Sequence, residues 1–438
     1  MTTSGDHDLR GAAGSLPPAA TVASPLRRRA VRAWQGLLDW FEETSQPNPA
    51  VRPVTARAVR AVVGVWALGR GVNFLLMFVM YELAHAFGWA FGPNAQRVTT
   101  FLQFLSDWDG ARYGRVSQIG YPTQLPLDAY GAVVPNDWAF LPVFPWLERI
   151  ISDATGIPWQ IVGISIAVLA SGGATIMLFL LLRAVTSPTA AWWGAVLFSF
   201  GPMSFIFVVG YAESLYLFLL FAAMLLAVKR RYLWIIPIGL VASYTRPGIL
   251  AFALGLGIVF VTRWFRRKVD PFPPSQLVSL MITGLVLAGA GLSWSWIADA
   301  VTGTPHAYLL TETSWWVPFV GEGHFAPFTP WFRMAWTFTG IIGVVLVAAL
   351  IAAFLLWIFS RPVRRLGMVV ATYGFGYGVY LFAVFLPQQS IFRLLLPMTP
   401  MLGDERLSST RRRRIISLVA ALVGQVLAVL LLWTIGFP

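Results

Sequence analysis

Cysteine is absent from this 438-residue chain, and only 12% of its residues are charged. The lack of cysteine excludes a disulfide framework and thiolate chemistry. Soluble domains are about a quarter charged, so this chain has too few charged side chains for an ordinary soluble surface. The two lysines, Lys229 and Lys268, do not follow a glycine, which excludes the Walker A loop of P-loop nucleotide-binding proteins.

The chain is instead rich in apolar residues. They make up 57% of the chain, and its mean hydropathy is +0.68. Apolar segments long enough to cross a bilayer, about 17 to 25 residues, recur between Val62 and Trp433. The sequence therefore predicts an all-α, polytopic integral membrane protein that is in contact with membrane lipids.

The formal net charge of +13 comes from arginine clusters between the apolar segments. This placement is typical of the positive-inside topology signal and does not indicate a nucleic-acid partner. It also favours contact with an anionic inner leaflet. The clusters are Arg27–Arg32, Arg52–Arg60, Arg183, Lys229–Arg231, Arg263–Lys268, Arg361–Arg365 and Arg411–Arg414.

With every cluster in the cytoplasm, the chain makes about eleven spans and is a multi-pass plasma-membrane protein. Residues 1–55 are predicted to form a basic cytoplasmic tail, partly disordered and partly amphipathic. Residues 56–403 form the main membrane domain, with a large first extracytoplasmic loop at 92–158 and a second at 301–333. Residues 404–438 are a cytoplasmic basic loop and a final span.

Two spans are predicted to be broken at the outer face. Tyr232–Val261 begins and ends beside basic clusters, so it crosses an even number of times, and its SYTRPG sequence interrupts a helix at Arg246. Leu366–Asp404 turns at Gln388–Ser390 and places Arg393 near the outside. Short or broken spans tend to line a site.

The polar residues that are not topology signals gather at the outer face. Nucleotide sugars and ATP are cytoplasmic, so an outward-facing transfer site needs another activated substrate. A polyprenyl-phosphate sugar meets this need because its tail lies in the bilayer. These polar residues are Asp107, Asp109, Arg112, Glu213, Arg246, His306, Glu312, Glu322, His324 and Arg393.

Several segments, in order, resemble the PIG-V family of the GT-C glycosyltransferase superfamily. The family transfers the second mannose of GPI anchors and has bacterial relatives. Its acidic residue after the Gly-Tyr is replaced here by Pro122 and Thr123, which leaves the acceptor open. The matching segments are WDGARYGRVSQIGYP (Trp108–Pro122), WAFLPVFP (Trp138–Pro145), GYAESLYLFLLF (Gly210–Phe221), LVASYTRPGILAF (Leu240–Phe252) and IFRLLLPMTP (Ile391–Pro400).

The resemblance implies a GT-C-like helical fold and transfer of mannose from polyprenyl-phosphate mannose to a lipid or glycolipid acceptor. It places the family's catalytic aspartate on Asp109. One carboxylate is enough as general base for an inverting single displacement, because a phosphate leaving group needs little acid help. Asp107 is the alternative base, and either aspartate could instead cap a helix.

Arginines at helix breaks inside a membrane are functional candidates, because a guanidinium fork suits a phosphate. We therefore predict that Arg246 and Arg393, with Arg112 as a third candidate, hold the donor phosphate. The alternative is an arginine that reaches to the outer headgroups. The predicted supporting residues are Glu213, Tyr211, Tyr121 and Arg70. Arg70 lies inside the first span and needs a partner there, for which Glu213 is the candidate.

No cofactor or metal ion is predicted, because the second loop lacks metal-ligand spacing. A transporter or flippase of lipid-linked sugars is the main alternative function, but transporters often carry internal repeats with similar broken helices, and the TRPG sequence has no counterpart later in the chain. A ligase of the O-antigen type is a third interpretation. The oligomeric state and the acceptor stay open.

Overall fold

The computed structural model describes residues 54–89 and 100–436, and within them the chain is helical, with one isolated antiparallel bridge between Leu127 and Val133. The predicted all-α fold is thus confirmed. All but the last two residues of the predicted tail at 1–55 lie outside the described residues, as does the start of the first loop. Nothing in the structure tests the predicted domain limits.

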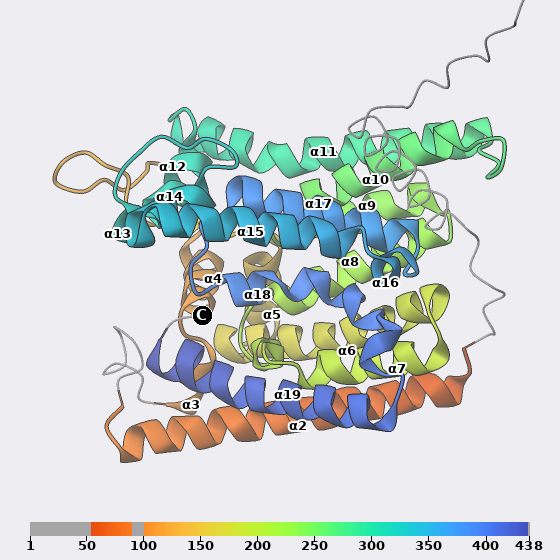
Figure 1. Cartoon of the computed structure of the whole chain (residues 1–438). Helices are drawn as coiled ribbons and strands as arrows, with labels where there is room; N and C mark the ends of the chain where they lie inside the picture. The colour runs from red at the N-terminus through yellow and green to blue at the C-terminus, as the bar shows by residue number, and fades with distance from the viewer. Residues whose placement is uncertain (1–53, 90–99, 437–438) are drawn as a thin grey trace, which may run out of the picture.

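Five helices are long and apolar enough to cross a membrane. In Figure 1 they run roughly parallel between the two ends of the molecule. They are largely unburied within the chain, as expected of helices that face lipid. The five are α2 (Ala56–Ala86), α6 (Trp159–Val185), α11 (Pro274–Thr302), α15 (Ile341–Ile358) and α19 with its π-helical continuation (Arg411–Ile435).

A second group of apolar helices is shorter. α9 has 9 residues and α8 has 16, which corresponds to lengths of about 14 Å and 24 Å, against a hydrocarbon core of about 30 Å. Helices this short do not reach from one side of the hydrocarbon core to the other, so we expect some of the turns between them to lie within the bundle. The group comprises α7 (Pro188–Phe200), α8 (Glu213–Val228), α9 (Ile235–Ser243), α10 (Ile249–Phe265) and α17 (Met368–Val384).

The break predicted at SYTRPG is confirmed. α9 ends at Ser243 and α10 begins at Ile249, with Arg246 between them. Gly248 has φ +132°, a conformation that L side chains rarely adopt, and an added Cβ would lie 2.8 Å from the Tyr216 hydroxyl. Glycine is therefore required at this turn. The count of eleven spans stays a prediction.

α2 packs closely against the end of α7. A Cβ on Gly69 would lie 2.8 Å from the Ser199 carbonyl oxygen. The neighbouring Arg70 donates to the carbonyl oxygens of Ser199 (2.9 Å) and Ser204 (3.4 Å) and lies 4.8 Å from the Phe207 ring centre. The predicted pairing of Arg70 with Glu213 is wrong, because backbone carbonyl oxygens at and just after the end of α7 bind two of its guanidinium nitrogens instead, while Nε has no hydrogen-bond partner among the described residues.

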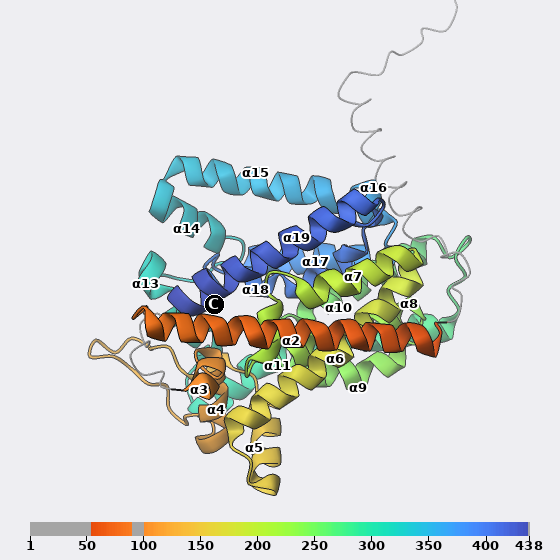
Figure 2. The same cartoon turned by 90° about the horizontal axis from the view of Figure 1, so that it is seen from below.

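The two predicted external loops gather at one end of the bundle (Figures 1 and 2). They pack against each other, because Asn136 of the first loop donates to the Thr311 hydroxyl of the second (2.9 Å). The indole of Trp294, on α11, donates to the carbonyl oxygen of Trp138 in the first loop (3.1 Å). The helices of this end are α3 (Phe101–Leu105), α4 (Asp109–Ile119), α5 (Val143–Thr155), α12 (Ala307–Ser314), α13 (Val317–Val320) and α14 (Pro330–Thr339).

The other end carries basic segments, including α16 (Arg361–Arg364) and the start of α19. Between the ends, the return of the chain after Ser390 consists of α18 (Ile391–Leu394) and a 3₁₀ segment, Leu396–Gly403. A further 3₁₀ segment, Glu405–Leu407, follows directly, and three others contribute short turns near other helices. These are Asp137–Ala139, Ser204–Val208 and Tyr232–Trp234.

Candidate active site

A sharp turn separates the two candidate aspartates. α3 ends at Leu105 and α4 begins at Asp109, so Asp107 and Asp109 do not share a helix. Trp108, between them, has φ +56° and ψ −120°. A side chain in this region of φ/ψ space costs about 1–3 kcal/mol, and such strain persists where the surroundings impose it, often at functional sites.

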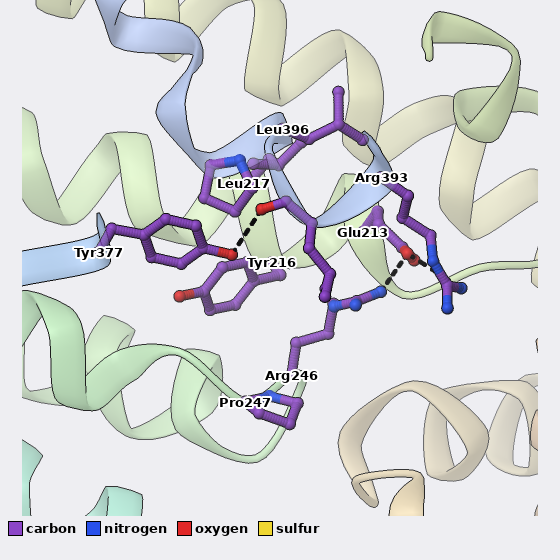
Figure 3. Close-up of a pocket in the computed structure, with 10 residues that line it drawn as sticks. Glu213, Tyr216, Leu217, Arg246, Pro247, Tyr377, Arg393 and Leu396 are labelled. Atoms are coloured by element: carbon purple, nitrogen blue, oxygen red, sulfur yellow. Dashed lines mark hydrogen bonds and ion pairs between the residues drawn. The ribbon is translucent and has the colours of Figure 1, made fainter. Parts of the chain in front are cut away.

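Four charged side chains meet in a continuous chain of ion pairs, which we call the ionic chain. Asp109 pairs with Arg393, Arg393 lies 3.4 Å from Glu213, and Glu213 pairs with Arg246. Figure 3 shows the last three of these residues converging from α8, the α9–α10 break and α18. Residues up to 284 positions apart in the sequence thus share one site.

The ionic chain is neutral overall and shielded from solvent. The side chains of Glu213, Arg393 and Arg246 are 4%, 9% and 12% exposed, whereas Asp109 is 26% exposed. Among the described residues, Arg393 Nε and Glu213 Oε2 have no hydrogen-bond partner. Since buried polar atoms are normally hydrogen-bonded, these two atoms indicate unused binding capacity.

A small cavity adjoins the ionic chain (Figure 3). It encloses about 10 Å³, roughly the space that one water molecule needs. The Tyr377 hydroxyl donates to the Leu394 carbonyl oxygen (2.8 Å) and so ties α17 to the segment that carries Arg393. The lining residues are Glu213, Tyr216, Leu217, Arg246, Pro247, Tyr377, Arg393, Leu394, Leu396 and Pro397.

Tyr211 contacts both ends of the Asp109–Arg393 pair. Its hydroxyl accepts a hydrogen bond from the Asp109 backbone N–H (3.2 Å), and its ring centre lies 5.2 Å from the Arg393 guanidinium carbon. Tyr211 is fully buried against Trp433 of the last span, with ring centres 5.5 Å apart. The structure therefore places this predicted supporting residue at the site.

Other predicted residues lie outside the ionic chain. The Asp107 carboxylate accepts the Trp108 backbone N–H (2.9 Å), a local turn contact, and burial raises the pKa of Asp107. Arg112 lies 3.4 Å from Asp137. The Tyr121 hydroxyl donates to a backbone carbonyl oxygen in the first loop (2.7 Å), so its observed contacts are structural.

Two further residues near the site were given no role from the sequence, although Glu312 was among the polar residues expected at the outer face. Glu312 and Tyr308 lie on α12 and are joined by a side-chain hydrogen bond. Burial raises the pKa of Glu312 to about 7, and the negative charge of Asp109 adds to this rise, while Arg246 opposes it. No motif marks Glu312, but the four-residue spacing from Tyr308 is a helical signal that was available.

Asp137 was also not predicted, although it is buried and pairs with Arg112 and, at 3.1 Å, with Arg115.

Within residues 54–89 and 100–436, no three or more His, Asp or Glu side chains are grouped to hold a metal ion. The independence of activity from metal ions stays a prediction.

No protein-family model and no curated protein sequence matches the chain. Among solved structures, ArnT from Cupriavidus metallidurans, crystallised bound to undecaprenyl phosphate, is similar over 81% of this chain, with 12% identity and a TM-score of 0.45. The Archaeoglobus fulgidus oligosaccharyltransferase, in complex with Zn and sulfate, is similar over 75%, with 15% identity and a TM-score of 0.37. The matches span 62% and 48% of those two proteins.

Proposed function

We propose that this protein is a membrane glycosyltransferase that transfers mannose from polyprenyl-phosphate mannose to a lipid or glycolipid acceptor at the extracytoplasmic face. The ionic chain is the observation that carries the proposal. It holds two arginines and two carboxylates among apolar helices. Burying such charges lowers the stability of the fold unless their pairing is complete, so an incompletely paired network indicates a function.

The arginines suit the phosphate of the donor. Glu213 begins α8, a helix about 24 Å long against a hydrocarbon core of about 30 Å, so we place the ionic chain near the boundary of the hydrocarbon, where a polyprenyl phosphate would lie. A guanidinium binds phosphate oxygens through two parallel N–H bonds. Arg393 has an unpartnered Nε for such a contact, and Arg246 supplies the second positive charge.

Asp109 is the proposed general base. Before the donor binds, its carboxylate is held by Arg393. When the phosphate takes over the guanidinium, Asp109 is released to accept the proton of the acceptor hydroxyl. The hydroxyl oxygen then bonds to the anomeric carbon as the bond from that carbon to the phosphate oxygen breaks. The phosphate leaves with the electron pair, and the arginines stabilise its charge.

The proposal is tested with the full chain in lipid nanodiscs, labelled polyprenyl-phosphate mannose and a total lipid extract as acceptor. We expect a labelled glycolipid product and the same rate in EDTA, since no metal ion is proposed. A flippase would instead move the intact donor across proteoliposome membranes. Movement of the donor without any labelled product would overturn the proposed transfer reaction.

A further inference from the structure

One side of α12 faces the first external loop. Tyr308, Thr311, Glu312 and Trp315 lie three, four and seven positions apart, so they share this side of the helix. Thr311 is fully buried and exchanges hydrogen bonds with Asn136 (2.9 and 3.2 Å). These bonds fix the orientation of the helix, so that Glu312 is held on the side toward the site.

The start of α12 is fixed as well. The two oxygens of the Asp299 carboxylate accept the backbone N–H groups of His306 (3.1 Å) and Ala307 (2.8 Å). A side-chain acceptor at these positions stabilises the first turn of a helix, because the first N–H groups have no partner within it. The shared face of α12 is therefore a rigid surface, anchored at its start and at its middle.

Groups from three other elements surround Glu312. Tyr308, on its own helix, donates to it, while Asp109 of α4, Arg246 of the α9–α10 break and Tyr380 of α17 lie within electrostatic reach. The side chain is only half-buried, so a ligand can reach it. Arg246 and Asp109 are members of the ionic chain, which places Glu312 next to the proposed reaction centre.

Trp315 adds a hydrogen-bond donor to the same face. Its indole Nε1 is buried and has no hydrogen-bond partner among the described residues. The Arg112 guanidinium lies over its ring, with 5.5 Å between the guanidinium carbon and the ring centre, and Phe140 packs edge-on at 6.4 Å. These contacts hold the ring in place and leave the N–H as its unused polar atom.

We propose that this face of α12 binds the acceptor through adjacent hydroxyl groups, so that the acceptor headgroup is a sugar or another vicinal diol. The proposal rests on the proposed transferase function. A carboxylate accepts hydrogen bonds from two neighbouring hydroxyls, and the Trp315 N–H donates to a third oxygen. Glu312 and Asp109 repel an anionic headgroup, and a simple alcohol satisfies only one of these contacts.

The charge of Glu312 gives this site a pH dependence. Because burial raises the pKa of Glu312 to about 7, the carboxyl is mostly protonated at pH 6 and mostly charged at pH 8. Hydrogen bonds to a charged acceptor are stronger than those to a neutral one. Binding of a vicinal diol should therefore tighten as the pH rises through 7.

The test measures binding without turnover, using the full chain in zwitterionic nanodiscs free of glycoside detergent. The probes are octyl α-mannoside, which carries adjacent hydroxyls, and the monooctyl ether of ethylene glycol, which carries one. We expect the mannoside to bind more tightly than the ether. Glu312→Gln should weaken mannoside binding about tenfold or more and abolish its pH dependence. Glu322→Gln, at an exposed position of the same loop, should change neither.

Equal binding of the two probes by the wild type, or unchanged mannoside binding by folded Glu312→Gln, would overturn the proposal. Glu312→Asp keeps the charge and provides a second variant if the amide is poorly folded; it should retain the pH dependence with weaker binding. Since no donor is present, this assay can succeed even where transfer of mannose is not found. The two proposals therefore fail separately.

Discussion

Buried arginines occur in two separate networks of the bundle, and their surroundings differ. At the basic end, Arg263 is 1% exposed, and each of its three guanidinium nitrogens donates a hydrogen bond. It also lies 4.3 Å from the Phe272 ring centre. Its acceptors are Asp270 (3.1 Å), the Tyr232 hydroxyl (3.0 Å), Gln276 (2.8 Å) and the Pro271 carbonyl oxygen (2.8 Å).

In the ionic chain, Arg393 and Glu213 are also buried, but Nε of the first and Oε2 of the second have no hydrogen-bond partner in the described residues. A buried arginine with complete hydrogen bonding is a structural element of the fold. A neutral but incompletely bonded ionic chain is suited to exchange partners with a ligand. The two networks therefore differ in how many of their polar atoms lack a hydrogen-bond partner, although both are buried.

The largest expected effect tests which end faces outward. A cysteine at Tyr130, which is 96% exposed in the first loop, should react with an impermeant thiol reagent in intact cells. A cysteine at exposed Arg267, beside Arg263, should react only after the membrane is opened. The cysteine-free chain gives no background. Labelling of the Arg267 variant alone would place the ionic chain at the cytoplasmic face.

The next effect concerns the carboxylates of the two networks. Asp109→Asn keeps the size of the side chain but removes the proton acceptor, so mannose transfer should fall by about two orders of magnitude or more. Asp270→Asn, in the Arg263 network, should reduce the amount of folded protein and leave the activity per folded molecule unchanged. Full activity of Asp109→Asn together with an inactive Asp107→Asn would reverse our assignment of the base.

A smaller effect is expected for the arginines. Arg246→Ala should raise the apparent KM for the donor and lower kcat, because it removes positive charge both before and during departure of the phosphate. Arg246→Lys should recover only part of this loss, since an ammonium lacks the bidentate geometry. In contrast, Arg263→Lys should change only folding yield. If Arg246→Lys were fully active, Arg246 would have no specific contact with phosphate.

Much of this site could be predicted from local sequence. The Pro-Gly after Arg246 fixes φ and breaks the helix, and an arginine at such a break must lie at membrane depth. The basic clusters then set how many times the chain turns, which brought Glu213, Arg246 and Arg393 to one end before any contact was known. These inferences need only short-range rules. The structure confirms the break at Arg246 and brings the three side chains together, while the number of spans and the side that faces outward stay predictions.

The partners of each side chain could not be predicted. Arg70 was expected to pair with Glu213, but carbonyl groups at the end of α7 lie closer, and backbone acceptors carry no sequence signal. Glu312 belongs to no motif, and its position depends on contacts between two loops, such as Thr311 with Asn136. Contacts between segments so far apart depend on the packing of the whole bundle.

Glu148 on α5 extends the comparison to a third kind of buried ionisable group, one with no partner. Its side chain is fully buried, and neither carboxyl oxygen has a hydrogen-bond partner among the described residues. It lies directly against α6, because a Cβ added to Gly163 would clash with one of its carboxyl oxygens. Burial raises the pKa of Glu148 to about 9, so the folded protein keeps the carboxyl protonated at neutral pH.

The raised pKa of Glu148 makes the stability of the protein depend on pH, and this dependence is the smallest effect that we predict. The unfolded chain releases this proton near pH 4.5 and the folded protein near pH 9, so the group lowers stability progressively between these values. Glu148→Gln removes this loss, and at pH 8 it should raise the thermal midpoint in detergent by about 1–3 °C, with no gain near pH 4.5. Asp153→Asn, exposed on the same helix, should show no such pH-dependent gain. A Gln variant less stable at both pH values would mean that the carboxyl of Glu148 makes a stabilising contact.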